Sequence, residues 1–189
     1  MPPKFKFTKS EITQAALNLT REQGISALTA RALAARLGCS VKPIFGLFKN
    51  MEEVQGGVLS EANKLYNSYL REDMSSGKYP VYKASGMGYI RFAKEERELF
   101  KLLFMRDRSS EEVEENREEI KPLIEMIMKN TGLSEEEAYI FHLEMWIYVH
   151  GIATMLATSY LNWDMEFISR TLTDGYMGLK HRYCGEGKE

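Results

Sequence analysis

Helix-start signals recur along this chain and constrain its fold more than any other feature of the sequence. Thr8–Glu11 and Ser134–Glu137 have the pattern of capping boxes, in which a hydroxyl and a glutamate three residues later bind each other's backbone amides. Asn50–Glu53 resembles a third such box. Because patterns of alternating apolar and polar residues are nearly absent, the sequence predicts an all-α protein of about nine helices.

The first three predicted helices are short and follow one another closely. The first begins after Thr8 and ends at Gly24, and the second is capped by Thr29 and ends at Gly38. Ser40 is expected to cap the third, which extends to Phe48 with Pro43 in its first turn. Longer helices are expected over 51–74, twice within 79–107, up to Asn130 with Pro122 near the start, over 134–161 and over 164–182.

Charge is divided unevenly along the chain. Residues 1–50 contain eight Lys and Arg against two acidic residues, a net charge of +6, which leaves a net charge of −8 for residues 51–189. A basic module joined to an acidic body is typical of a protein that binds a polyanion with one of its parts. Chance scatter of surface charge is the alternative explanation.

The sequence does not indicate secretion, a disulfide framework or a membrane protein. Cys39 and Cys184 are far apart and lack metal-binding spacing, and the N-terminal segment has no apolar run of signal-peptide length, so a cytoplasmic protein is expected. Residues 138–161 are long enough to span a bilayer, but they contain Glu144 and two histidines and have acidic flanks. We interpret this segment as a buried helix and expect no membrane partner.

The turn between the second and third helices carries the strongest functional signal. Three alanines of the second helix permit close crosswise packing, and Gly38 reverses the chain. Three short helices in this arrangement predict a helix-turn-helix, whose third helix enters the major groove of DNA. The sequence therefore predicts a DNA-binding domain over 1–50 and a second helical domain over 51–189.

The same segment resembles the DNA-binding domain of the TetR family of repressors. It keeps the family's threonine, the leucine-glycine-x-serine turn, the spacing of two aromatic residues and the acidic start of the fourth helix. These are Thr29, Leu37–Ser40, Phe45, Phe48 and Glu52–Val54. The chain departs from the family at Phe45, where tyrosine is usual, and at Met51, where lysine is usual. Both departures remove an expected phosphate contact, so DNA affinity would depend more on Lys42 and Lys49.

A second resemblance concerns the C-terminal half. Glu144–Gly151 is similar to a tryptophan, histidine-glycine signature in one subgroup of TetR-family C-terminal domains. That subgroup places the segment on the eighth helix, between a ligand cavity and the dimer partner, and the ninth helix completes a four-helix dimer interface. The resemblance implies a C-terminal ligand-binding and dimerisation domain over 51–189. It also implies a homodimeric repressor that a small apolar or aromatic effector releases from a palindromic operator. A charge at Ala153 is expected to disrupt the dimer.

Eight residues are candidates for contact with double-stranded DNA. Thr29, Ser40 and Lys49 are expected at phosphates, with Arg31 beside them, whereas Val41, Lys42, Pro43 and Phe45 are expected to face the groove. Lys42 is the candidate for a guanine edge. For Phe45 the alternative is core packing beside Phe48. Lys4 and Lys6 are candidates for an arm along the DNA backbone, with a disordered terminus as the alternative.

Six residues are candidates for effector contact. They are Tyr89, Phe92, Phe104, Met105, Trp146 and His150. The methionines of the chain suit an adaptable apolar cavity, although residues of these types at helical spacing more often fill a core. No metal or cofactor is expected, because the histidines and cysteines lack metal-binding spacing.

Two other functions compete with that of a repressor. An enzyme is not expected, because the sequence contains no glycine-rich phosphate loop, nucleophile elbow or zinc-protease motif. A helical interaction protein with weakened or lost DNA binding is the alternative that Phe45 and Met51 suggest. Steep salt dependence of DNA binding would distinguish the repressor from this alternative.

Overall fold

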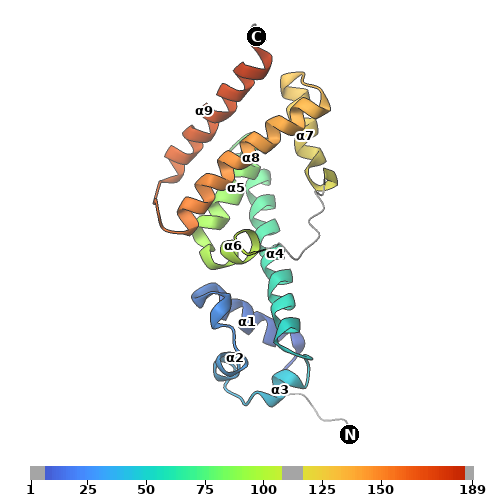
Figure 1. Cartoon of the computed structure of the whole chain (residues 1–189), viewed down its shortest axis with the longest axis vertical. Coiled ribbons are helices and arrows are strands. Elements are labelled where there is room, and N and C mark those ends of the chain that lie inside the picture. Colours follow the sequence, from blue (N-terminus) through green and yellow to red (C-terminus); the bar gives the residue numbers. More distant parts are fainter. Residues whose placement is uncertain (1–6, 108–116, 186–189) are drawn as a thin grey trace. The chain divides into compact units, whose positions relative to one another are not determined.

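Nine α-helices and one short 3-10 helix form the part of the chain that the computed structural model describes, residues 7–107 and 117–185 (Figure 1). They are α1 (Lys9–Gln23), η1 (Ile25–Ala27), α2 (Ala30–Arg36), α3 (Lys42–Phe45), α4 (Met51–Ser75), α5 (Val81–Glu95), α6 (Arg97–Phe104), α7 (Arg117–Thr131), α8 (Glu135–Ala157) and α9 (Met165–Cys184). This confirms the predicted all-α class. The N-terminal arm with Lys4 and Lys6 lies outside the described residues.

The chain divides by packing into two compact units. The N-terminal unit comprises Met1–Ser68 and Glu96–Arg106, and the C-terminal unit comprises Tyr69–Glu95 and Asp107–Glu189. Helix α4 therefore contributes residues to both units. The predicted domain boundary after residue 50 stays a prediction, because these units are defined by packing and not by function.

In the N-terminal unit, α1 packs against η1, α2 and α6. The apolar face of α1 is buried at Ile12, Ala16 and Leu19, as its helical spacing predicts. Leu33 of α2 and Ile44 of α3 are fully buried as well. Removing side chains of this size from water stabilises the packing of the three short helices.

A partly buried ion pair joins α1 to the start of α6 within this unit. Arg21 donates from Nε and Nη2 to the carboxylate of Glu96, whose side chain is almost wholly buried. Gly24 ends α1 with φ +81°, and a Cβ atom at this glycine would lie 2.8 Å from Oε2 of Glu98. The sequence predicted the stop at Gly24 but not the ion pair, whose partners lie far apart along the chain.

Both predicted capping boxes are present. Thr8 Oγ1 accepts a hydrogen bond from the Glu11 amide at 3.2 Å, and the Thr8 amide donates to Glu11 Oε2 at 2.7 Å. Ser134 and Glu137 form the same reciprocal pair at the start of α8. These bonds satisfy amides that the first turn of a helix leaves without a partner.

In the C-terminal unit, α8 packs against α5, α7 and α9, and α5 also contacts α7 and α9 (Figure 1). One core cluster joins α7 to α8 and includes Ile124, Ile127 and Phe141. The ring of Phe141 is fully buried and meets Tyr176 of α9 edge-on, with centroids 5.3 Å apart. Such edge-to-face pairs add stability beyond the area that they bury.

Two helix boundaries in this unit differ from the prediction. Helix α7 begins at Arg117, so Pro122 lies inside it rather than near its start. Helix α8 ends at Ala157 and not at Leu161, because the backbone of Ser159 adopts a left-handed conformation with φ +58°. A positive φ at serine gives no signal in a sequence, whereas a glycine would have given one.

Helix α8 is long and apolar enough to cross a membrane by length and composition, and it is the only such helix among the described residues. Nine of its residues are nonetheless buried within the C-terminal unit, where it contacts three other helices. The core helix of a soluble protein passes the same test. The packing therefore supports the interpretation of α8 as a core helix.

Candidate nucleic-acid interface and effector site

The turn between α2 and α3 has the backbone geometry that a helix-turn-helix requires. The hydroxyl of Thr29 caps α2 by accepting the amide of Ala32 at 3.1 Å. Gly38 follows α2 with φ +62°, a conformation that favours glycine, and the amide of Cys39 donates to Ala34 O at 3.0 Å. The predicted reversal at Gly38 is confirmed.

The third helix is shorter than predicted, and the expected cap at Ser40 is wrong. Helix α3 spans Lys42–Phe45, and the residue before it is Val41, whose backbone is already helical with φ −68° and ψ −18°. A capping side chain needs an extended backbone directly before the helix, so Ser40 stands one position too early. No side chain caps α3.

Helix α3 exposes most of the residues that were predicted to face the groove. Val41, Lys42 and Phe45 are exposed, and Pro43 is half-buried. Ile44 is fully buried between them, and Phe48 is also buried. The alternative of core packing for Phe45 is therefore wrong, because its neighbours and not its own ring fill the interior.

The basic side chains of residues 7–50 form two groups. Lys9, Arg21 and Arg36 bind the carboxylates of Glu53, Glu96 and Glu22. Arg36 does so with both terminal nitrogens, at 2.6 and 2.5 Å. In contrast, Arg31, Lys42 and Lys49 are exposed and make no ion pair with any described residue. The second group contains the three basic residues predicted to contact DNA.

Glu53 fixes the connection between α3 and α4. Its Oε2 accepts the backbone amide of Lys49 at 2.6 Å, and its Oε1 accepts Nζ of Lys9 at 2.6 Å. These two bonds, the amide of Lys49 first, lower the pKa of Glu53 from its ordinary value. Asn50 Oδ1 in turn accepts the amide of Glu53 at 3.0 Å, which confirms the predicted start of α4. The sequence identified this glutamate only as part of a cap and missed its contact with Lys49.

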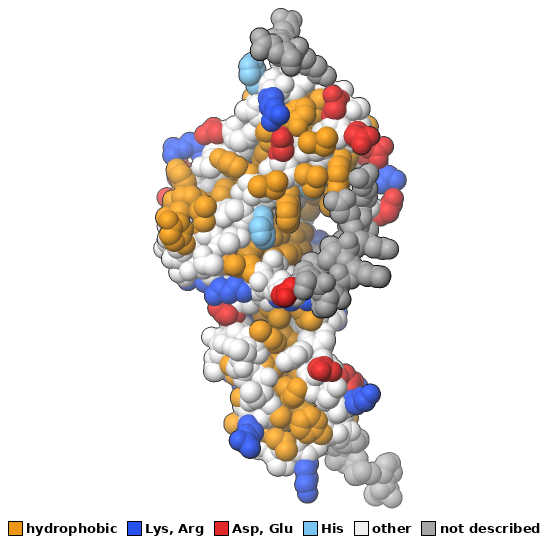
Figure 2. All heavy atoms as spheres, viewed as in Figure 1, with side chains coloured by type: hydrophobic (Ala, Val, Ile, Leu, Met, Phe, Trp, Pro, Cys, Tyr) orange, Lys and Arg blue, Asp and Glu red, His pale blue; other side chains and the backbone are white. Residues whose placement is uncertain are grey.

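Three of the six predicted effector residues lie together in the C-terminal unit. The hydroxyl of Tyr89 on α5 lies 2.8 Å from Nδ1 of His150 on α8. The indole of Trp146 stacks on the same imidazole, with centroids 5.1 Å apart and planes 16° apart. Tyr89 is buried, His150 is half-buried and Trp146 is exposed, so this aromatic trio extends from the core to the surface of the unit. Figure 2 shows hydrophobic side chains gathered around a histidine on the visible face of this unit.

The other three predicted effector residues have different surroundings. Phe92 is fully buried in the C-terminal unit and meets the ring of Tyr69 edge-on at 5.3 Å between centroids. Phe104 packs against Tyr66 in the N-terminal unit, with centroids 5.1 Å apart, and the exposed Met105 ends α6. Contact with an effector stays a prediction for all six residues.

A second tyrosine–histidine pair was not predicted from the sequence. The hydroxyl of Tyr82 on α5 lies 3.2 Å from Nδ1 of His142 on α8. The pair repeats the contact of Tyr89 with His150 about two helical turns away, so the near-equal spacing of the two tyrosines and the two histidines was a usable signal. Burial lowers the pKa of both histidines, which favours neutral imidazoles at neutral pH.

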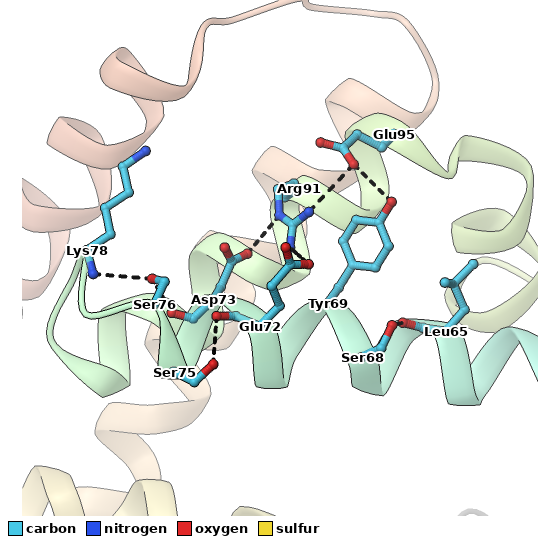
Figure 3. Close-up of polar contacts among 10 residues, drawn as sticks. All are labelled: Leu65, Ser68, Tyr69, Glu72, Asp73, Ser75, Ser76, Lys78, Arg91 and Glu95. Atoms are coloured by element: carbon cyan, nitrogen blue, oxygen red, sulfur yellow. Dashed lines mark hydrogen bonds and ion pairs between the residues drawn. The ribbon is translucent and has the colours of Figure 1, made fainter.

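A polar cluster at Arg91 joins the end of α4 to α5 (Figure 3). Nε donates to Asp73 Oδ2 and Nη2 to Glu72 Oε2, each at 2.9 Å. The guanidinium lies over the ring of Tyr69, 4.3 Å from its centroid, and the Tyr69 hydroxyl donates to Glu95 at 2.9 Å. Only the spacing of Arg91 and Glu95, one helical turn apart, was visible in the sequence.

Helices α8 and α9 leave apolar side chains at the surface of the C-terminal unit. Ile140 and Ile147 lie two turns apart on one face of α8, and both are exposed, Ile147 to 64%. Met177 on α9 is exposed as well. Glu144 of α8 and Arg182 of α9 form an ion pair at 3.3 Å. An exposed apolar face of this kind is typical of a protein interaction site.

Two family models match the chain. Residues 12–55 match the model for bacterial regulatory proteins of the tetR family, and residues 82–174 match the model for the tetracyclin repressor-like C-terminal domain. No curated protein is significantly similar to the chain. The first match contains the whole helix-turn-helix, and the second contains the aromatic trio. The likeness of 144–151 to one subgroup stays a prediction. Together with the geometry of the turn at Gly38, the matches establish that the chain belongs to the TetR family of DNA-binding transcriptional regulators.

Proposed function

We propose that this protein is a homodimeric, cytoplasmic repressor, without enzymatic activity, that binds a palindromic operator and is released from it by a small apolar or aromatic effector. One observation carries the proposal. Of the eight residues predicted to contact DNA, all except Pro43 are exposed, and none of the three basic ones makes an ion pair with a described residue. Cations left exposed in this way suit phosphate contact.

The proposed contacts follow from this exposure. Thr29, Arg31, Ser40 and Lys49 are assigned to phosphates, and Val41, Lys42, Pro43 and Phe45 to the major groove. With two copies of the chain, two α3 helices would occupy successive major grooves of a palindromic site. Loss of DNA binding remains the competing outcome, because Phe45 and Met51 lack the polar groups usual in the family.

A fluorescence anisotropy titration with DNA from upstream of the gene, repeated at several salt concentrations, tests this proposal. Lys42→Ala, at a base edge, should abolish the preference for the operator over random DNA, whereas Lys49→Ala, at a phosphate, should weaken binding to all sequences and reduce the slope of log affinity against log salt by about 1. Arg36→Ala is the matched control, because the Arg36 guanidinium is bound to Glu22 and should contribute much less. Binding of the unmodified protein no better than to random DNA would favour the interaction protein.

The proposed dimer uses the exposed apolar face of α8 and α9. Ile147→Asp should give monomers in analytical ultracentrifugation, because a charge in an apolar interface is costly to desolvate. Tyr160→Asp, at an exposed hydrophobic residue after α8, is the control and should leave dimers intact. A charge at Ala153 is a poor test, since this residue is fully buried in the core of its own unit. Dimers of unchanged stability with Ile147→Asp would contradict this interface.

The proposed effector site contains the aromatic trio. Trp146 and Trp163 are the two tryptophans of the chain, so Trp163→Phe leaves Trp146 as the only indole fluorophore. A panel of planar aromatic compounds and fatty acids would be screened for changes in this fluorescence and for release of labelled DNA. A compound that binds at the trio should produce both effects at the same concentration. Release without any change at Trp146 would place the effector elsewhere.

A further inference from the structure

Helix α3 and the residue before it expose two apolar side chains on a basic module. Val41 is 36% exposed and Phe45 is 45% exposed, and among the described residues up to Asn50 no other large hydrophobic side chain is classed as exposed. Ile44, which lies next to Phe45, is fully buried. In this one turn, Ile44 therefore packs into the interior and stabilises the fold. Val41 and Phe45 form an outer pair that faces solvent.

The outer pair occupies one side of the helical turn. The amide of Phe45 donates to Val41 O at 3.3 Å, so the two residues are one turn apart and their side chains share a face. Lys42, exposed and without an ion pair among the described residues, lies directly after Val41. An apolar pair beside an unpaired cation suits a partner that offers both negative charge and apolar groups. In Figure 2, hydrophobic side chains gather on the visible face of the N-terminal unit, with Lys or Arg side chains at the edges.

DNA offers such an apolar group at one kind of base. In the major groove the thymine 5-methyl group is the apolar feature of the base edges, and apolar side chains including phenylalanine contact it. We propose that Val41 and Phe45 recognise thymine methyl groups in each half-site of the operator. This inference rests on the proposed DNA-binding function and names a base, thymine, that the operator should contain. Residues one turn apart are separated by about 6 Å along the helix. Base pairs are stacked about 3.4 Å apart, so the two methyl groups should lie within about two base pairs.

A contact of Phe45 with the sugar-phosphate backbone is the competing assignment. A phenyl ring has no hydrogen-bond donor, so it cannot anchor a phosphate as a tyrosine hydroxyl does. Packing of the ring against sugars would raise the affinity for all sequences equally, because sugars carry no sequence information. Methyl recognition instead predicts a penalty at particular thymines. The two assignments can therefore be separated by base substitution.

The experiment begins with DNA selected from a random pool by the full-length protein. Each thymine of the selected site is then replaced, one at a time, by deoxyuridine, which removes the 5-methyl group and preserves base pairing. We expect affinity to fall about three- to tenfold at one or two positions in each half-site, the effect of burying one methyl group. Substitutions at all other thymines should have little effect.

Two variants assign the effect to side chains. Phe45→Ala should bind the unmodified site more weakly and lose its sensitivity to deoxyuridine at one of these positions, and Val41→Ala at the other. Arg36→Ala, in the same unit but paired with Glu22, should retain both sensitivities. Because Val41 and Phe45 are exposed, both variants should keep the helical content and thermal stability of the protein.

The outcomes separate this inference from the proposed function. A selected site whose deoxyuridine derivatives all bind equally well would overturn methyl recognition and leave the repressor proposal standing. Methyl recognition would also be overturned if the Phe45→Ala variant still lost as much affinity as the unmodified protein at every thymine replaced by deoxyuridine. Failure to select any sequence would overturn the proposed function and this inference with it.

Discussion

The two units of this protein differ in what they leave at the surface. Among residues 7–50 of the N-terminal unit, three cations form ion pairs and three others are exposed without one, and Val41 and Phe45 are exposed as well. The C-terminal unit exposes large apolar residues on α8 and places the two histidines of that helix at tyrosine hydroxyls. The first surface suits a charged polymer and the second suits apolar partners. One chain thus carries two surfaces of opposite chemistry.

The units also differ in what stabilises them. The N-terminal unit combines caps and ion pairs with a mainly aliphatic core, whereas aromatic rings from α5, α8 and α9 fill much of the C-terminal core. Polar contacts are worth less in water than burial of large rings. Substitutions in the two units should therefore have unequal costs, and the following changes test that difference from the largest expected effect to the smallest.

Phe141→Ala should cause the largest loss of stability. It removes a fully buried ring that contacts Tyr176 and Tyr183 and should lower the free energy of unfolding by about 3–5 kcal/mol. Urea denaturation followed by tryptophan fluorescence would measure this, because both tryptophans belong to the C-terminal unit. Tyr160→Ala, at an exposed ring in the same unit, is the control and should cost far less. Equal losses would refute an aromatic core.

Arg21→Met tests the strongest polar contact of the N-terminal unit. It removes the partner of the buried Glu96 carboxylate and should cost about 3 kcal/mol, the low end for a buried pair, because Arg21 is half-exposed. Circular dichroism during thermal unfolding would measure the loss. Arg36→Met breaks an exposed pair with Glu22 and should have a much smaller effect. If both variants behaved alike, burial of Glu96 would be energetically irrelevant.

Matched cap substitutions compare the two units directly. Thr8→Ala and Ser134→Ala each remove the same capping hydroxyl and should each cost about 1 kcal/mol. Hydrogen exchange should quicken at the start of α1 in the first variant and at the start of α8 in the second. Faster exchange throughout both units in either variant would indicate that the units unfold together rather than separately.

Acid should affect the two units in different pH windows, and this effect is expected to be the smallest. Burial lowers the pKa of His142 and His150 from 6.5. As the pH falls below about 6.5, these histidines therefore bind protons in the unfolded chain before they do so in the folded one, and the C-terminal unit loses stability. Hydrogen bonds lower the pKa of Glu11, Glu22 and Glu53 from 4.5, so the N-terminal unit loses their contribution only below that value.

Thermal unfolding between pH 7 and pH 4 would resolve these windows. His142→Gln should flatten the dependence between pH 7 and pH 5, because it removes a buried titrating group. Asn162→Gln, at an exposed residue that does not titrate, should leave it unchanged. A pH profile that is identical for all three proteins would contradict the burial of a neutral His142.

How much could be predicted from the sequence also differs between the units. The caps at Thr8 and Ser134, the reversal at Gly38 and the start of α4 depend on residues within a few positions of each other, and all are confirmed. The wrong prediction of a cap at Ser40 was also a local matter. Nothing in the sequence indicates that the backbone of Val41 is already helical, which leaves Ser40 one position too early to cap α3. Local chemistry was therefore sufficient for most of the helix-turn-helix.

Contacts between distant residues could not be predicted in this way. Arg21 and Glu96, or Arg91 and Asp73, come together only after the helices pack, and no spacing rule links them. Of the six predicted effector residues, the structure brings together Tyr89, Trp146 and His150, whose contact depends on the packing of α5 against α8. Their residue types suggested a site, but only the packing showed which of them meet.

The two tyrosine–histidine pairs have a further consequence for the tautomers of His142 and His150. A phenol hydroxyl is a good donor and a neutral Nδ1 a good acceptor, so each tyrosine of α5 favours the imidazole that carries its proton on Nε2. Burial raises the pKa of Tyr82, which keeps that hydroxyl protonated. Helix α5 thus favours a proton on Nε2 at each of the two histidines of α8. Any displacement of α5 along α8 would release both imidazoles to exchange between tautomers, and nitrogen-15 spectra of the two rings would record that displacement.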